Sequence, residues 1–167
     1  DYTWESSLWS LSVAYSAFFQ WKKLSETERE NVYRLLKAEC NYELERNIPT
    51  GYIGDTKAEE NGWETDVLAV TLGLFPHDAL APRWFQRMRE FAVNSYSHPS
   101  DTSPLYRGQN LYPDYTLQNH DFFHTSYQNV VTQELGEAAL ALKLFRGDGR
   151  WRTDDLFHNC DQVTSRV

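Results

Sequence analysis

Five side chains able to bind a polar group or move a proton stand close together in the second half of the sequence. Asn119, His120, Asp121, His124 and Tyr127 lie within nine residues. An amide can bind a carboxylate, an imidazole can exchange a proton near neutral pH, and a phenol can protonate a leaving oxygen. Together they could bind, neutralise and deprotonate a polar substrate. The same composition is also compatible with the polar entry to an ordinary helix.

His120 and His124 are four residues apart, and Asp121 follows the first of them. This order resembles a zinc motif in which aspartate replaces glutamate, because two histidines at that spacing can share a metal ion. Aspartate is shorter than the glutamate that acts as the base in such sites, and no third ligand follows at a familiar spacing. We therefore expect no metal and no other cofactor at this segment.

A second group of charged residues precedes Trp63. Glu59 and Glu60 stand three to four positions before it, so a helix would place them at one end of its buried face. In a structural interpretation their negative charges lie in the first turn of the helix and stabilise it by interacting with the positive end of the helix dipole. In a functional one, Glu59 or Glu60 is the general acid or base of a glycoside hydrolase, with Asp55 or Asp66 as the partner carboxylate.

The elements that position both groups are predicted to be helices, because apolar residues recur at helical spacing and no useful strand-like alternation is present. Capping-box residues, prolines and glycines set the expected ends. The first helix is expected over residues 2–24 and the second from Ser25 to about Arg46. The third should run from an N-cap at Asp55 to Pro76, and the fourth from Pro82 to about residue 96. The fifth is expected over residues 122–145, ended by Gly147-Asp148-Gly149, and a sixth helical segment should follow Trp151, capped by Thr153-Asp154-Asp155. The third should bury one stripe, formed by Trp63, Val67, Val70 and Leu74.

Two connections are predicted to be loops: 47–54, with one proline and two glycines, and the longer segment 100–118. A connection as long as the second is usually functional or disordered, and Tyr106, Tyr112 and Tyr115 favour a functional loop. Helices joined in this way fit antiparallel hairpins, either in a bundle or in an α/α toroid. Since toroids carry long functional loops at one rim, we predict an all-α chain that is part of an incomplete α/α toroid. Residues 1–167 form one domain or a fragment of a larger toroid domain.

Composition narrows the classes of partner. The net charge of −8 and the dispersed basic residues argue against nucleic acid, although Lys57 and Arg107 could make one cleft positive. Aromatic residues make up 15% of the chain, which suits either stacking on sugar rings or an aromatic core. No membrane span is visible.

Other sequence features leave the cellular compartment and the completeness of the chain open. Cys40 and Cys160 lie far apart, with no metal or redox spacing, and either pair with each other or stay free. Because the sequence opens on Asp1 within a helical pattern, we expect an excised or processed piece of a longer protein.

The Asn119-His120 pair resembles the Asn-His pair of heparinase II/III-like and alginate-lyase-like polysaccharide lyases, which are α/α toroids. Residues 51–61 also resemble a block of uncharacterised bacterial toroid proteins near these lyases. The resemblance covers about residues 51–145. Two departures stand out: Asp121 replaces the usual glycine, and a family tyrosine tens of residues beyond the pair would fall past Val167.

The resemblance implies a mechanism and a set of residues. Asn119, with or without His120, would neutralise a uronate carboxylate so that the C5 proton becomes acidic. A histidine or tyrosine would remove that proton, and a tyrosine would protonate the leaving oxygen. Candidate catalytic residues are Asn119, His120, His124 and Tyr127; candidate substrate-binding residues are Lys57, Glu59, Glu60, Trp63, Arg107 and Tyr115. Tyr127 would share a helical face with His120 if the helix began that early, and as a base it would need a lowered pKa.

Three functions therefore compete. The first is a polysaccharide lyase acting on a uronate-containing polysaccharide or oligosaccharide, for which a secreted or periplasmic location is expected. The second is a glycoside hydrolase that uses carboxylates among Asp55, Glu59, Glu60 and Asp114. The third is a noncatalytic carbohydrate-binding or helical interaction module. The sequence leaves the oligomeric state open.

Overall fold

The computed structural model describes residues 5–144 and 150–166, and its described part is mostly helical. The elements in chain order are α1 (Glu5–Gln20), the 3-10 turn η1 (Trp21–Lys23), α2 (Glu26–Glu45), α3 (Ala58–Leu74), α4 (Ala81–Ser95), β1 (Gln118–Asn119), β2 (Phe122–Phe123), α5 (Thr125–Leu144), η2 (Asp155–Phe157) and α6 (Cys160–Thr164). The predicted all-α class is confirmed. The expected helix start at Tyr2 and the helix end at 145–149 lie outside the described residues.

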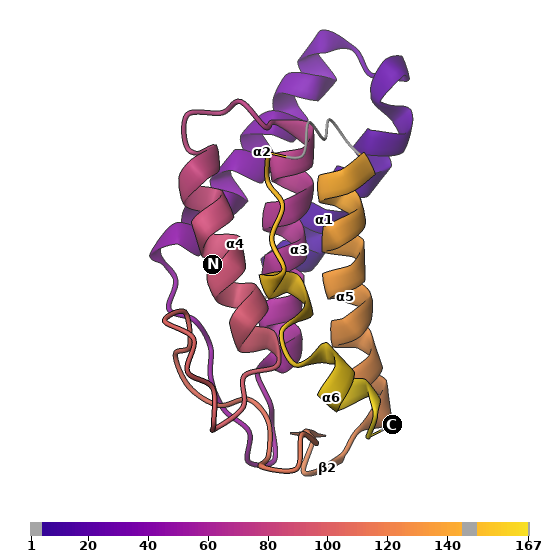
Figure 1. Cartoon of the computed structure of the whole chain (residues 1–167). Helices are drawn as coiled ribbons and strands as arrows, with labels where there is room; N and C mark the ends of the chain where they lie inside the picture. Colours follow the sequence, from indigo (N-terminus) through magenta and orange to yellow (C-terminus); the bar gives the residue numbers. More distant parts are fainter. Residues whose placement is uncertain (1–4, 145–149, 167) are drawn as a thin grey trace.

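The helices form two rows of antiparallel neighbours (Figure 1). In one row α1, α3 and α5 run in the same direction; in the other, α2 and α4 run back, followed by the segment that carries η2 and α6. α3 lies at the centre and packs against α1, α2, α4 and α5. No helix of the described part is both long and apolar enough to cross a membrane.

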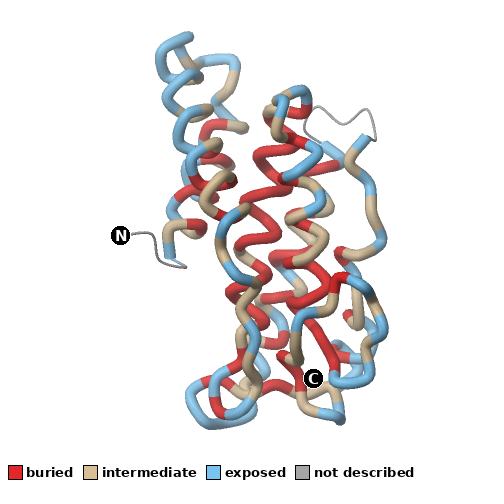
Figure 2. The backbone as a smooth tube through the Cα atoms, turned by 90° about the vertical axis from the view of Figure 1, so that its left-hand side faces the viewer, coloured by how far each residue is buried: buried red, intermediate tan, exposed pale blue. Residues whose placement is uncertain are grey.

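Because α3 lies at the centre, it is buried on all sides and not along one stripe as predicted. Every residue from 58 to 74 except Trp63 is buried, so the predicted single stripe is wrong, and Trp63 is its most exposed member rather than its first buried one. A helix enclosed by four neighbours has no solvent face, which also explains why its polar residues are buried. Figure 2 shows this burial along the middle of the molecule.

The predicted start of α2 is confirmed and that of α3 is wrong. Ser25 forms the expected capping box with Glu28. In α3, however, the N-cap position is Lys57 and Asp55 lies outside the helix. The backbone N–H of Thr56 donates to the carbonyl of Gln118 at 2.8 Å, so this loop is paired with β1 instead of continuing the helix.

A short hairpin precedes α5, which begins at Thr125 rather than at the predicted Phe122. β1 and β2 pair antiparallel, and the two residues between them, His120 and Asp121, have φ values of 55° and 66°. Two positive φ angles define the tight turn that favours Asn, Asp and Gly. Asp121 therefore stands where the backbone conformation suits glycine, asparagine or aspartate.

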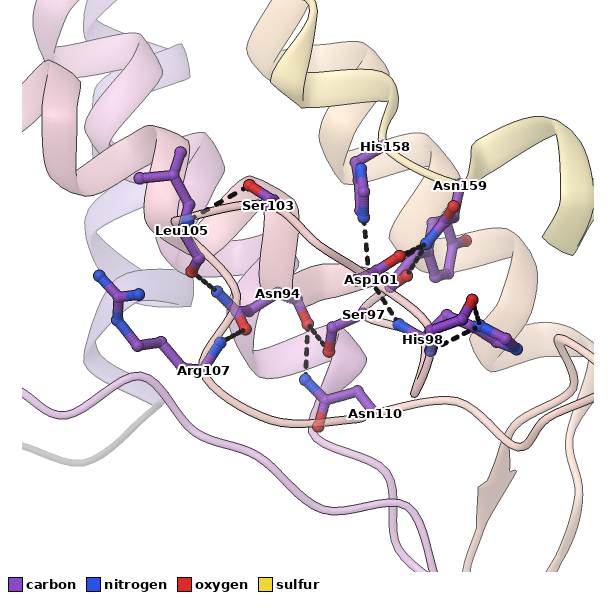
Figure 3. A network of polar contacts seen from close by, with 12 residues as sticks. Asn94, Ser97, His98, Asp101, Ser103, Leu105, Arg107, Asn110, His158 and Asn159 are labelled. Carbon is purple, nitrogen blue, oxygen red and sulfur yellow. Dashed lines mark hydrogen bonds and ion pairs between the residues drawn. The ribbon is translucent and has the colours of Figure 1, made fainter.

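The long connection between α4 and β1 is ordered by buried amides and one carboxylate (Figure 3). The Asn94 side chain donates to the carbonyl of Leu105 at 2.8 Å and accepts from the backbone of Arg107 at 2.9 Å. Asn110 donates to the Asn94 carbonyl at 2.5 Å, and its side-chain oxygen accepts from the backbone of Gly51 at 2.8 Å. This connection is thus tied to α4 and to the loop before α3.

Asp101 fixes the same connection to the C-terminal segment. Its carboxylate lies 2.8 Å from Nε2 of His158 and accepts from Asn159 at 3.1 Å (Figure 3). The sixth helical segment predicted after Trp151 is present as the 3-10 turn η2 followed by the five-residue helix α6. Cys40 and Cys160 are both free and buried.

Candidate functional site

The two long connections and the hairpin lie at one end of the helix rows, where α3 and α5 begin (Figure 1). We call the residues gathered there the hairpin site. It comprises seven of the residues that the sequence singled out: Lys57, Glu59, Glu60, Asn119, His120, His124 and Tyr127.

A buried carboxyl–amide pair joins α3 to β1. The side-chain nitrogen of Asn119 donates to Oε1 of Glu59 at 3.0 Å, and the two residues are 2% and 5% exposed. Burial raises the pKa of Glu59 to about 7, and the negative charge of Glu60 adds to the effect. The second carboxyl oxygen of Glu59, Oε2, and the amide oxygen of Asn119, Oδ1, have no hydrogen-bond partner. The pair therefore has unused hydrogen-bonding capacity.

Three rings lie beside one another at the start of α5. The ring centroids of His124 and Tyr127 are 4.5 Å apart, and that of His120 lies 6.0 Å from Tyr127 and 6.4 Å from His124. His120 is not on α5, so the helical spacing expected between it and Tyr127 is wrong. The tight turn brings its ring to Tyr127 by a different route.

The pKa of Tyr127 is raised, first by burial and then by the negative charges of Glu59 and Asp55. The lowered pKa that a tyrosine base requires is thus contradicted. A raised pKa instead keeps the phenol protonated, which suits a proton donor.

The cations of the hairpin site are held by carboxylates. Nζ of Lys57 lies 2.8 Å from Asp55 and 3.0 Å from Glu60. Arg46, at the end of α2, lies 2.9 Å from the other oxygen of Glu60 and also pairs with the fully buried Glu64. Arg46 and Glu64 were not predicted. A charged residue at a helix end is common on surfaces, and only the packing of α2 on α3 shows that Arg46 meets the buried carboxyl of Glu64.

Three predicted binding residues have partners elsewhere. Arg107 pairs with Glu90 of α4 at 3.1 Å, so it does not join Lys57 in a positive cleft. The ring of Tyr115 stacks on His98, with centroids 4.0 Å apart. Trp63 hydrogen-bonds to the side chain of Glu134 on α5.

Among the other carboxylates proposed for a hydrolase, each has a partner of its own. Asp114 is exposed and accepts from the hydroxyl and backbone of Thr116. Asp66 is buried further along α3, where its Oδ1 accepts from the hydroxyl of Tyr15 at 2.8 Å. Asp55 is bound to Lys57.

Three carboxylates, rather than the histidines of the hairpin, lie close enough together to share a metal ion. Over residues 5–144 and 150–166, the side chains spaced to share an ion are Asp66, Glu134 and Glu137, and neither His120 nor His124 is among them. Sequence spacing could have suggested Glu134 and Glu137, which share a helical face, but not their meeting with Asp66.

The chain matches no protein-family model, and comparisons with curated proteins and with solved structures gave no match either.

Proposed function

We propose that this chain belongs to a carbohydrate-active enzyme that cleaves a uronate-containing polysaccharide by β-elimination, on an incomplete α/α toroid. The observation that carries the proposal is the buried pair of Glu59 and Asn119 beside the rings of His120, His124 and Tyr127. The two rows of helices, parallel within each row and antiparallel between them, are consistent with the successive hairpins of a toroid.

Glu59 and Asn119 supply the groups that a uronate carboxylate needs. With a pKa of about 7, Glu59 is protonated in a substantial fraction of molecules at neutral pH. Its second oxygen can then donate a hydrogen bond, as can the second hydrogen on the Asn119 nitrogen. Two donors facing one carboxylate would neutralise its charge and make the adjacent C5 proton easier to remove.

The rings supply the proton transfers. A neutral imidazole of His124 or His120 takes the C5 proton, and the electrons of that C–H bond form the C4–C5 double bond. The C4–O4 bond breaks at the same time, and the leaving oxygen receives the phenolic proton of Tyr127. The raised pKa of Tyr127 suits this role, because the phenol must be protonated when the substrate binds.

The raised pKa of Glu59 also suits the general acid of a glycoside hydrolase. A hydrolase needs a second carboxylate across the scissile bond, and the nearest carboxylates on α3 and its preceding loop, Glu60 and Asp55, are engaged by Lys57. The elimination mechanism therefore agrees better with the contacts of the site.

The test is incubation with a panel of uronate polymers, sulfated and unsulfated, with ultraviolet absorbance as the measure of unsaturated product. Asn119→Ala is expected to abolish the signal and to leave the helical circular dichroism unchanged. Asn129→Ala, at an exposed position on α5, is the matched control and should retain activity. Reducing ends without unsaturation would select the hydrolase, and glycan binding without cleavage would select the binding module.

A further inference from the structure

Three carboxylates meet where α3 and α5 pack, about two helical turns along α3 from Glu59. Asp66, Glu134 and Glu137 each present an oxygen, and these oxygens all lie within 4.8 Å of one another. Glu134 and Glu137 are one turn apart and share a face of α5. The group lies outside the hairpin site and takes no part in the proposed elimination.

Asp66 is the most deeply buried member of this group. The residue has no exposed surface, and its Oδ1 accepts from the Tyr15 hydroxyl of α1 at 2.8 Å. Its Oδ2 is buried and receives no N–H or O–H donor, and the carboxyl of Asp66 also meets that of Glu134 within hydrogen-bond range. A buried carboxylate oxygen is costly unless a proton or a cation compensates it.

The other contacts of the group do not neutralise it. Glu134 accepts from the indole of Trp63, and Glu137 accepts from the side chain of Gln133 at 2.8 Å; both donors are uncharged. The ion pairs found in the described residues involve other carboxylates.

We propose that Asp66, Glu134 and Glu137 bind a hard divalent cation, with Ca²⁺ as the best fit. Such ions take carboxylate oxygens at about 2.0 to 2.6 Å, so oxygens that all lie within 4.8 Å of one another can share one ion. Ca²⁺ accepts irregular coordination, whereas Mg²⁺ demands near-ideal octahedral ligands, so Ca²⁺ is the better fit for carboxylates fixed on two packed helices. Glu137 is only half-buried, which leaves a side from which water can complete the coordination.

A bound cation would join α3 to α5 and, through Tyr15, to α1 (Figure 1). Glu59 stands on α3 and Tyr127 on α5, so the ion would fix the relative position of the two helices that carry the hairpin site. The cation site rests on its own contacts and stands whether or not the chain is a lyase.

Terbium luminescence tests the site directly, because Tb³⁺ substitutes for Ca²⁺ and the Trp63 indole beside Glu134 can sensitise it. After dialysis against a chelator, the chain should give sensitised emission with Tb³⁺ that Ca²⁺ displaces, and Ca²⁺ should raise the melting temperature. Removing one ligand charge should weaken Ca²⁺ binding by about 10- to 100-fold. Asp66→Asn and Glu137→Gln are the ligand variants, and Glu30→Gln, an exposed position on α2, is the matched control.

Further measurements distinguish a bound cation from a shared proton and from a variant that fails to fold. If Asp66→Asn fails to fold, the half-buried Glu137→Gln still reports on the site. Under excitation selective for tryptophan, Trp63→Phe should lose most of the emission yet retain Ca²⁺ binding by calorimetry, which locates the ion beside Glu134. No emission and no thermal shift in the unaltered chain would overturn the proposal, as would unchanged Ca²⁺ affinity in both ligand variants. Stabilisation of Asp66→Asn at high pH, with no effect of Ca²⁺, would indicate a shared proton in place of the ion and also overturn it.

Discussion

Replacement of Glu59 by glutamine should make the protein more stable at alkaline pH than the unaltered chain. Glutamine has the shape of a protonated glutamate, and its carbonyl oxygen can still accept the 3.0 Å hydrogen bond from Asn119. What the substitution removes is the ability to carry a negative charge in a position that is 5% exposed. The effect should therefore depend on pH.

The sign and size of this stability difference follow from the pKa of Glu59, which burial raises from 4.5 to about 7. Because the folded state holds the proton more tightly than the unfolded chain, this group's contribution to the free energy of unfolding is fully present below pH 4.5. It is lost as the pH rises to 7. The loss is about 3 kcal/mol as an upper value, and it then stays constant. Glu59→Gln should match the unaltered chain at pH 4.5 and exceed it by up to about 3 kcal/mol at pH 8.

Urea unfolding at a series of pH values between 4.5 and 8.5, followed by circular dichroism, measures the difference. Burial also raises the pKa of Glu43 and of Glu134 to about 7, so both proteins lose stability over this range and only their difference reports on Glu59. Glu60→Gln is the control: it removes ion pairs to Arg46 and Lys57 and should destabilise at pH 8. A stability difference for Glu59→Gln that is the same at pH 5 and pH 8 would refute the reasoning.

Three further predictions concern neighbouring residues. Tyr127→Phe should lower kcat about 10²- to 10⁴-fold, because it removes the proton donor, while the melting temperature changes little. Asp121→Gly should be neutral or stabilising and Asp121→Val destabilising by about 1 to 2 kcal/mol in urea, since residue 121 has a φ of 66°; equal effects would contradict the turn. Arg46→Ala should cost about 3 to 5 kcal/mol of unfolding free energy, because it leaves Glu64 buried without its cation; a loss below 1 kcal/mol would contradict that ion pair.

Helical periodicity predicted the fold class because the buried faces of α1, α4 and α5 repeat at helical spacing. It failed at α3, where burial on every side erased the difference between faces. It also failed at β1 and β2, since strands of two residues have no period to detect and the tight turn between them depends on backbone angles. The capping box at Ser25 was predictable because it is a contact local to the sequence.

The candidate site was predictable to the extent that its residues are local in sequence. Asn119, His120, His124 and Tyr127 were found together because nine residues hold them all. The contact between Asn119 and Glu59 crosses 60 positions, and the meeting of Asp66 with Glu134 depends on how α3 packs on α5. Arg107 and Tyr115 were selected for their chemistry, and the partners that occupy them, Glu90 and His98, follow only from the fold.

The chemistry of cleavage is the most direct test of the proposed function. Products formed from a uronate polymer in H₂¹⁸O should be examined by mass spectrometry and by proton NMR. Elimination predicts a vinyl proton at C4 of the new non-reducing end and no ¹⁸O incorporated by the cleavage. Asn119→Ala should give no cleaved fragments. Saturated fragments that carry ¹⁸O at new reducing ends would contradict it, and so would the absence of cleavage across the whole panel.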